Sequence, residues 1–180
     1  MKNIMVDLET LGQVPGCVVL SIGAVAFDDT NLGAEFYTVI NIADSKSFGL
    51  HENDETLAWW GKQNPEARKV LDEASDMATS KSVVATIKAF NQYLAPFGHG
   101  SIKVWGNGAN FDNTILSAMY SAADLKTPWP FWNDRCYRTL KNLFKDIKVP
   151  ARLGTYHNAL DDAKHQALHA VQIFQANSFK

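Results

Sequence analysis

Two acidic residues, Asp7 and Glu9, end an apolar run that begins at Ile4, close to the N-terminus. Such a run is typical of a central strand that is buried on both faces of a sheet. Side chains alternate along a strand, so Asp7 and Glu9 project from the same face. Two half-buried carboxylates repel each other and lose solvation, so such a pair usually has a cation or a shared proton between them. The pair therefore indicates a cation site, and the alternative is two solvated acids in a turn.

Further acids stand at the starts of two predicted helices. Asp112 follows a short strand and a glycine loop, and the last helix opens with Asp161 and Asp162. Each could simply stabilise a helix dipole, which is worth about 0.3 to 1 kcal/mol. In a mixed sheet, however, both helix starts can lie beside the end of the first strand. Four carboxylates would select magnesium or manganese, and two such ions about 4 Å apart catalyse in-line displacement at phosphorus.

His157 is the histidine whose position suggests chemistry. It follows a glycine-containing loop and stands five residues before Asp162. A neutral imidazole near the cations can accept the proton of an attacking water molecule. The other histidines are expected to be surface or packing residues: His51, His99, His165 and His169.

Three short motifs resemble those of the DEDDh, or DnaQ-like, exonuclease superfamily. They are Asp-Leu-Glu-Thr at 7–10, Asn-Phe-Asp at 110–112 and His-x-Ala-x-x-Asp at 157–162. The resemblance extends over nearly the whole chain and implies a 3′-5′ exonuclease that uses two Mg²⁺ or Mn²⁺ ions. It implies His157 as the general base and, as metal ligands, Asp7, Glu9, Asp112 and Asp162.

The spacing of the last motif distinguishes two branches of this superfamily. The tyrosine branch places Tyr four residues before the last Asp, where this chain has Asn158, whereas the histidine branch has a spacing of five. Asp161 remains an alternative to Asp162 from the residues alone. Consecutive helix residues differ by about 100°, so the two acids cannot face the metals equally. The family pattern selects Asp162.

Two longer segments, 57–63 and 132–139, are similar to phage exonucleases of the DNA exonuclease A type and to related bacterial 3′-5′ exoribonucleases. A tryptophan can stack on a base, although the pair Trp59 and Trp60 on an amphipathic helix is also typical of a core. Arg135 could hold a phosphate or pair with Asp134 or Asp112. The candidate substrate-binding residues are Thr10, Leu11, Trp60, Gln63, Asn110, Arg135 and Arg138.

Composition favours one compact domain covering residues 1–180. The chain has 46% hydrophobic and 20% charged residues, and no apolar run approaches the ~20 residues of a membrane helix. We expect a cytoplasmic protein whose cysteines, Cys17 and Cys136, are reduced, because neither belongs to a paired spacing. A net charge of −2 argues against holding nucleic acid by bulk electrostatics.

Hydrophobic periodicity predicts strands first and then strands alternating with helices. This order favours an α/β fold with a ribonuclease H-like, mixed five-stranded sheet flanked by helices. Predicted strands cover 4–9, 18–27, 35–41, 102–105 and 134–138, and predicted helices cover 54–63, 66–74, 83–94, 111–119, 140–147 and 158–176.

These observations predict an enzyme that releases nucleoside monophosphates from the 3′ end of single-stranded nucleic acid. DNA is slightly favoured by the phage resemblance, and the alternative is an exoribonuclease acting on RNA or 3′ overhangs. A non-catalytic nucleic-acid-binding module is disfavoured because no acid of the motifs is missing. An endonuclease on the same fold would lack the ending at 157–162. A homodimer through a surface aromatic patch is compatible with so short a chain.

Overall fold

A five-stranded mixed sheet forms the centre of the molecule. The computed structural model describes residues 1–152 and 154–177. The strands lie in the order β3-β2-β1-β4-β5, with the first three antiparallel and with β4 parallel to both β1 and β5. Their bounds are β1 Asn3–Thr10, β2 Val19–Phe27, β3 Leu32–Val39, β4 Lys103–Gly106 and β5 Asp134–Cys136. The predicted ribonuclease H-like sheet is confirmed.

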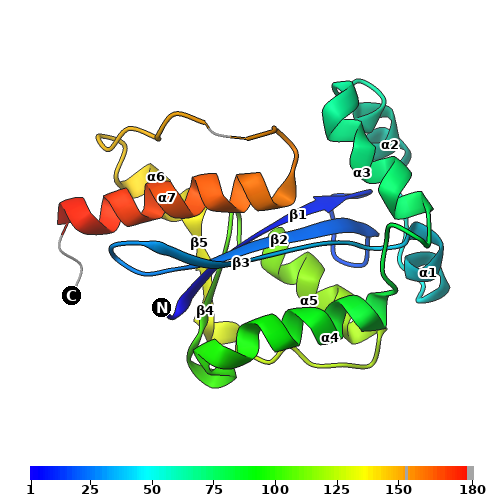
Figure 1. Ribbon diagram of the computed structural model, residues 1–180, viewed down its shortest axis with the longest axis horizontal. Helices are drawn as coiled ribbons and strands as arrows, with labels where there is room; N and C mark the ends of the chain where they lie inside the picture. Colours follow the sequence, from blue (N-terminus) through cyan, green and yellow to red (C-terminus); the bar gives the residue numbers. More distant parts are fainter. Residues whose placement is uncertain (153, 178–180) are drawn as a thin grey trace.

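Helices cover both faces of this sheet. In Figure 1, α7 and α6 lie along one face, α4 and α5 lie along the other, and α2 and α3 stand beyond the end of β1. The helices are α1 Ile42–Ser47, α2 Asp54–Trp60, α3 Pro65–Ser75, α4 Val83–Leu94, α5 Asp112–Ala122, α6 Tyr137–Leu143 and α7 Ala159–Asn177, with short 3-10 turns at Ala95–Phe97, His99–Ser101 and Phe131–Asn133.

Several predicted boundaries were wrong, for local reasons. The third strand ends at Val39 because Asn41 caps the unpredicted helix α1, its side chain accepting a hydrogen bond from Asp44 N at 2.9 Å. The last strand ends at Cys136 because its pairing partner β4 ends at Gly106. Helix α6 therefore begins earlier than predicted and ends at Leu143. The predicted loop over 150–156 includes residue 153, which lies outside the described residues.

The alternation along β1 divides the core in two. Ile4, Val6 and Leu8 belong to the larger core, which also contains residues of α4 and α5. Met5 belongs to a second core with Ala163 and other residues of α7. Because every second side chain of a strand faces the same way, Asp7 and Glu9 continue the face of Met5. Both acids therefore point toward α7, as their common face predicted.

Two glycines allow the acid-bearing helices to approach the sheet. A Cβ atom at Gly23 would lie 2.1 Å from the backbone carbon of Ala159, at the start of α7. A Cβ atom at Gly106 would lie 2.8 Å from the Cβ of Asp112, at the start of α5. Gly23 also pairs with Asp7 across β1 and β2. The first turn of α7 thus rests directly over Gly23 of β2, next to the β1 position that carries the first acid.

We expect Gly23→Ala to destabilise the fold and to impair the site together. The added methyl would meet backbone atoms, which cannot rotate away, so α7 must move off the sheet. Overpacking of this kind costs about 1 to 3 kcal/mol, measurable as a lower urea midpoint. Gly100→Ala is the matched control, because a Cβ there would meet nothing within 4 Å. A Gly23→Ala protein as stable as the control would contradict this account.

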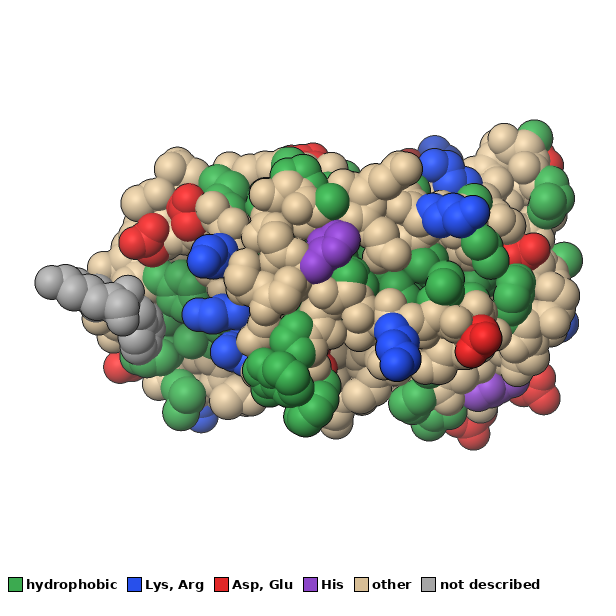
Figure 2. All heavy atoms as spheres, turned by 90° about the horizontal axis from the view of Figure 1, so that it is seen from below, with side chains coloured by type: hydrophobic (Ala, Val, Ile, Leu, Met, Phe, Trp, Pro, Cys, Tyr) green, Lys and Arg blue, Asp and Glu red, His purple; other side chains and the backbone are tan. Residues whose placement is uncertain are grey.

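The remaining sequence predictions concern membrane-spanning helices, the cysteines and the surface charge. Within residues 1–152 and 154–177, no helix has the length and apolar character needed to cross a membrane. Cys17 and Cys136 are both free. On the face shown in Figure 2, Lys and Arg side chains form small groups that are set apart by uncharged regions, and acidic side chains lie on the same face. This face therefore does not offer one continuous basic surface to a duplex.

Candidate active site

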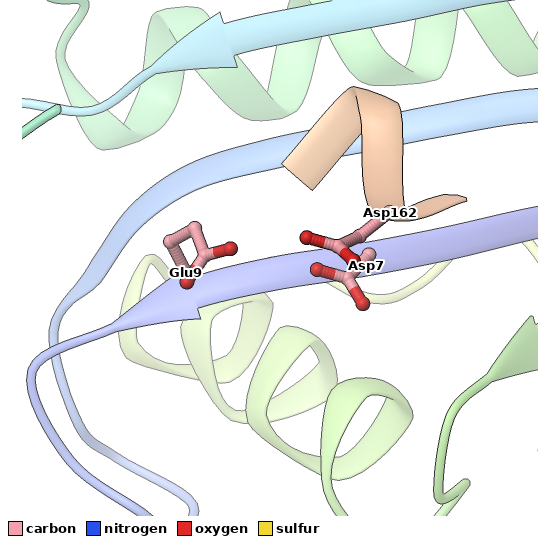
Figure 3. Close-up of side chains that lie close together, drawn as sticks. All are labelled: Asp7, Glu9 and Asp162. Atoms are coloured by element: carbon pink, nitrogen blue, oxygen red, sulfur yellow. The ribbon is translucent and has the colours of Figure 1, made fainter. Parts of the chain in front are cut away.

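Three carboxylates converge at the end of β1. Asp7, Glu9 and Asp162 each offer one oxygen, and these three atoms all lie within 4.8 Å of one another. Figure 3 shows Asp7 and Glu9 on strand β1, with Asp162 reaching toward them from the first turn of α7. A β-bulge follows Glu9, where the register with β2 shifts before Thr10. Bulges of this kind often redirect side chains beside active sites.

Asp112 is the fourth acid, placed by α5 from the opposite side of the sheet. It is 3% exposed and lies outside the group of three, yet its charge raises the pKa of both Asp7 and Glu9. Burial raises the pKa of Asp112 itself to about 7, against hydrogen bonds from the backbone at Asn107 and Leu8. The structure thus brings together all four acids that the motifs indicated.

The cluster carries more negative charge than its surroundings stabilise. Burial, followed by the charge of Asp112, raises the pKa of Asp7 well above its ordinary value. Burial and then the charge of Asp162 raise the pKa of Glu9 to about 8. Such a group must bind protons or cations near neutral pH. Since all its ligand atoms are carboxylate oxygens, the residues fit hard divalent cations such as Mg²⁺ or Mn²⁺.

A dependence of stability on pH follows from these shifts. The ordinary pKa values are 4.5 for Glu9 and 3.8 for Asp112, and the folded values are about 8 and about 7. At pH values between the unfolded and the folded pKa of each acid, the folded chain therefore binds more protons than the unfolded chain. The free energy of unfolding consequently falls as the pH rises through this range. We expect the melting temperature in chelator to fall from pH 5 to pH 8. Added Mg²⁺ should raise it more at pH 8 than at pH 5, and equal shifts would contradict the cation site.

The structure distinguishes between the two adjacent acids of α7. Asp161 turns away from the cluster, and its Oδ2 accepts a hydrogen bond from the backbone N of Thr155 at 2.8 Å. Asp162 Oδ1 forms an ion pair with Arg152 at 2.6 Å, and its Oδ2 accepts a hydrogen bond from the backbone N of His157 at 3.0 Å. Asp162 therefore belongs to the cluster, as the family pattern selected. No local sequence pattern marks Arg152 as a partner of this acid.

His157 lies at the cleft in an unusual backbone conformation. Its φ is +62°, a left-handed value that is uncommon for a residue other than glycine and is found at functional sites. The imidazole packs edge-on against Trp59, with ring centroids 5.0 Å apart, and lies 6.3 Å from the ring of Trp60. Two tryptophans of α2 thus contact the candidate base, which the sequence did not predict.

A cleft of about 700 Å³ opens over the acids. Trp60 is 1% exposed, and its Nε1 donates a hydrogen bond to Thr10 O at 2.9 Å, so its main role is to join α2 to the end of β1. Trp59 is 41% exposed and lies on the same wall of the cleft. The cleft is lined by Asp7, Leu8, Glu9, Thr10, Gly12, Gln13, Glu55, Thr56, Trp59, Trp60, Asn107, Phe111, His157, Asp162 and Gln166.

The other candidate substrate-binding residues lie outside this lining. Leu11 is buried in the larger core, and the Gln63 amide donates to the backbone oxygen of Trp59. Arg138 lies close to the site, donating to Asn107 O at 2.7 Å. Asn110 does not line the cleft, and Arg135 lines a separate hollow.

Arg135 forms neither of the two ion pairs considered for it. Its guanidinium donates hydrogen bonds to the backbone oxygens of Trp132 and Asp134. Among the described residues, no ion pair joins Arg135 to the carboxylate of Asp134 or Asp112. Arg135 shares its hollow with Asn3, the first residue of β1, whereas the acids lie toward the other end of that strand.

Fold and acid set together define a metal-dependent nuclease of the DEDDh, or DnaQ-like, superfamily. The structure resembles the nuclease domain of 3′hExo, a DEDDh family member bound to rAMP, with a TM-score of 0.63 and 15% identity over 97% of this chain and 92% of that one. It also resembles exonuclease X in complex with 5′ overhanging duplex DNA, with a TM-score of 0.62 and 14% identity over 99% and 94% of the chains.

A match over nearly the whole sequence identifies the family of this chain. The family described as the 3′-5′ exoribonuclease Rv2179c-like domain matches residues 2–174, and the chain belongs to it. An exodeoxyribonuclease of Enterobacteria phage T4 is 27% identical over 163 residues, covering 77% of this chain and 70% of the phage protein. The chain is therefore a 3′-5′ exonuclease acting on nucleic acid, as its motifs predicted.

Proposed function

We propose that this chain, as one domain over residues 1–180, removes nucleoside monophosphates from single-stranded 3′ ends by a two-metal mechanism. The observation that carries this proposal is the convergence of Asp7, Glu9 and Asp162 within 4.8 Å, with buried Asp112 beside them. The family match over residues 2–174 supports the single domain.

The residues divide the work of hydrolysis between them. Asp7, Glu9, Asp112 and Asp162 would hold two Mg²⁺ or Mn²⁺ ions, which supply positive charge opposite the developing charge on the scissile phosphate. His157, which lines the same cleft, accepts the proton of the attacking water. Trp59 offers an exposed ring to the terminal base, a contact worth about 1 to 3 kcal/mol.

The relatives differ in the kind of nucleic acid, DNA or RNA, that their names give as substrate. The phage relative is named an exodeoxyribonuclease, whereas the family is described as an exoribonuclease domain. We propose single-stranded DNA as the preferred substrate on the phage relative. RNA or a 3′ overhang is the second candidate, favoured by the family description.

One digestion experiment tests both the metal-dependent exonuclease activity and the preferred nucleic acid. Matched single-stranded DNA, single-stranded RNA and 3′-overhang duplexes, each labelled at the 5′ end, are incubated with Mg²⁺ or Mn²⁺ and in excess chelator. We expect a ladder that shortens from the 3′ end, fastest for DNA, and no cleavage in chelator. A blocked 3′ end should stop the reaction. Cleavage of the blocked strand indicates an endonuclease, and full activity in chelator rejects the metal mechanism.

A further inference from the structure

Gln166 is a buried polar residue of the cleft that the motifs do not include. It stands four residues after Asp162 on α7, so both side chains lie on the same face of that helix. The residue is 5% exposed and lines the cleft beside the acids. A side chain with two hydrogen-bonding ends is costly to bury unless both ends have partners.

One end of Gln166 is satisfied by an acid of the cluster. Its Nε2 donates a hydrogen bond to Asp7 Oδ1 at 2.7 Å. Since an amide N–H donates only, this bond favours the charged form of Asp7 and fixes the rotation of its carboxylate. Because an oxygen of Asp7 lies within 4.8 Å of oxygens of Glu9 and Asp162, the orientation of this carboxylate affects the geometry of the cluster.

The other end has no partner among the described residues. Gln166 Oε1 is buried and accepts no hydrogen bond. Exchanging the two ends of the amide would place Oε1 against the carboxylate of Asp7, so the observed orientation is the favourable one whenever Asp7 is charged. An unpaired buried acceptor that lines a cleft can take a donor from water or from a group that enters the cleft.

We infer that Gln166 is a positioning residue: its amide orients Asp7 for cation binding, and its carbonyl accepts a hydrogen bond from water or a hydroxyl that enters with the cation. This inference rests on the proposed function of the site. Groups that orient metal ligands in this way typically contribute about 10- to 100-fold to metal affinity or activity.

Gln166→Met tests the role, because it preserves length and volume and removes both hydrogen-bonding ends. Mg²⁺ binding is measured by titration calorimetry without nucleic acid, and the fold is checked by thermal melting in chelator. We expect Mg²⁺ affinity to fall about 10- to 100-fold. Gln172→Met on the same helix is the matched control, since Gln172 does not line the cleft. Affinity within twofold of wild type in a folded Gln166→Met protein would overturn the inference.

A second variant and a kinetic readout separate positioning from a merely structural role. Gln166→Asn retains an amide on a shorter side chain, so it should weaken Mg²⁺ binding with little change in melting temperature. For both variants, the loss of rate on 5′-labelled DNA should shrink as Mg²⁺ is raised. A loss that persists at all Mg²⁺ concentrations overturns the role. If wild type binds Mg²⁺ and degrades no nucleic acid, the proposed function fails while the affinity comparison still decides on Gln166.

Discussion

Asp162→Asn is expected to lower hydrolysis at least about a thousandfold, which corresponds to about 4 kcal/mol of transition-state stabilisation. The amide keeps the size of the carboxylate and removes one of the charges that hold cations beside Asp7 and Glu9. Single-turnover digestion of 5′-labelled DNA in saturating Mg²⁺ measures the loss. Thermal melting verifies that the variant folds, since the ion pair with Arg152 is lost as well.

The adjacent acid provides the control for this prediction. Asp161→Asn makes the same chemical change one residue earlier, at a side chain that bonds Thr155 and lies outside the cleft. We expect its rate to stay within about fivefold of wild type, a difference of about 1 kcal/mol. Equal losses in the two variants would show that the change acts through the start of α7 rather than through cation binding.

His157→Ala should reduce the rate about 10²- to 10⁴-fold, the usual contribution of a general base. Mg²⁺ affinity should stay close to that of wild type, because His157 is not one of the clustered acids. Titration calorimetry measures the affinity, and single-turnover digestion measures the rate. Added imidazole should restore part of the rate, since the deletion leaves space in the cleft where the ring lay.

His165→Ala is the matched control, because His165 stands on α7 and lines a different hollow. It should keep the wild-type rate. If His157→Ala also keeps the wild-type rate, His157 is not the base. If it loses Mg²⁺ binding together with rate, the His157 side chain acts by positioning the acids, and the assignment as base is wrong.

The sheet and the acids were predictable because they depend on local patterns. The period-2 and period-3.6 repeats place most strands and helices, and the shared face of Asp7 and Glu9 follows from alternation alone. The choice of Asp162 over Asp161 needed the family pattern. The physical reason for this choice is that the carboxylate of Asp161 is hydrogen-bonded to the backbone of Thr155.

Other parts of the site depend on contacts between distant segments. Gln166 meets Asp7 across 159 positions of sequence, and Trp60 meets Thr10 across 50. No local pattern distinguishes these residues from ordinary helix residues. Trp60 is buried and Trp59 is exposed because of the way α2 packs against β1. Two adjacent tryptophans in a sequence do not indicate which of them will be buried.

Helix α7 has a consequence for when the enzyme becomes active during synthesis. Strand β1 is synthesised before α7, yet Asp162 and Gln166 of α7 lie against Asp7 of β1. A ribosome-bound chain from which α7 has not emerged therefore lacks one of the acids of the proposed metal site. Because the proposed mechanism needs Asp162, we expect nuclease activity to appear only after α7 has been synthesised and has packed on the sheet.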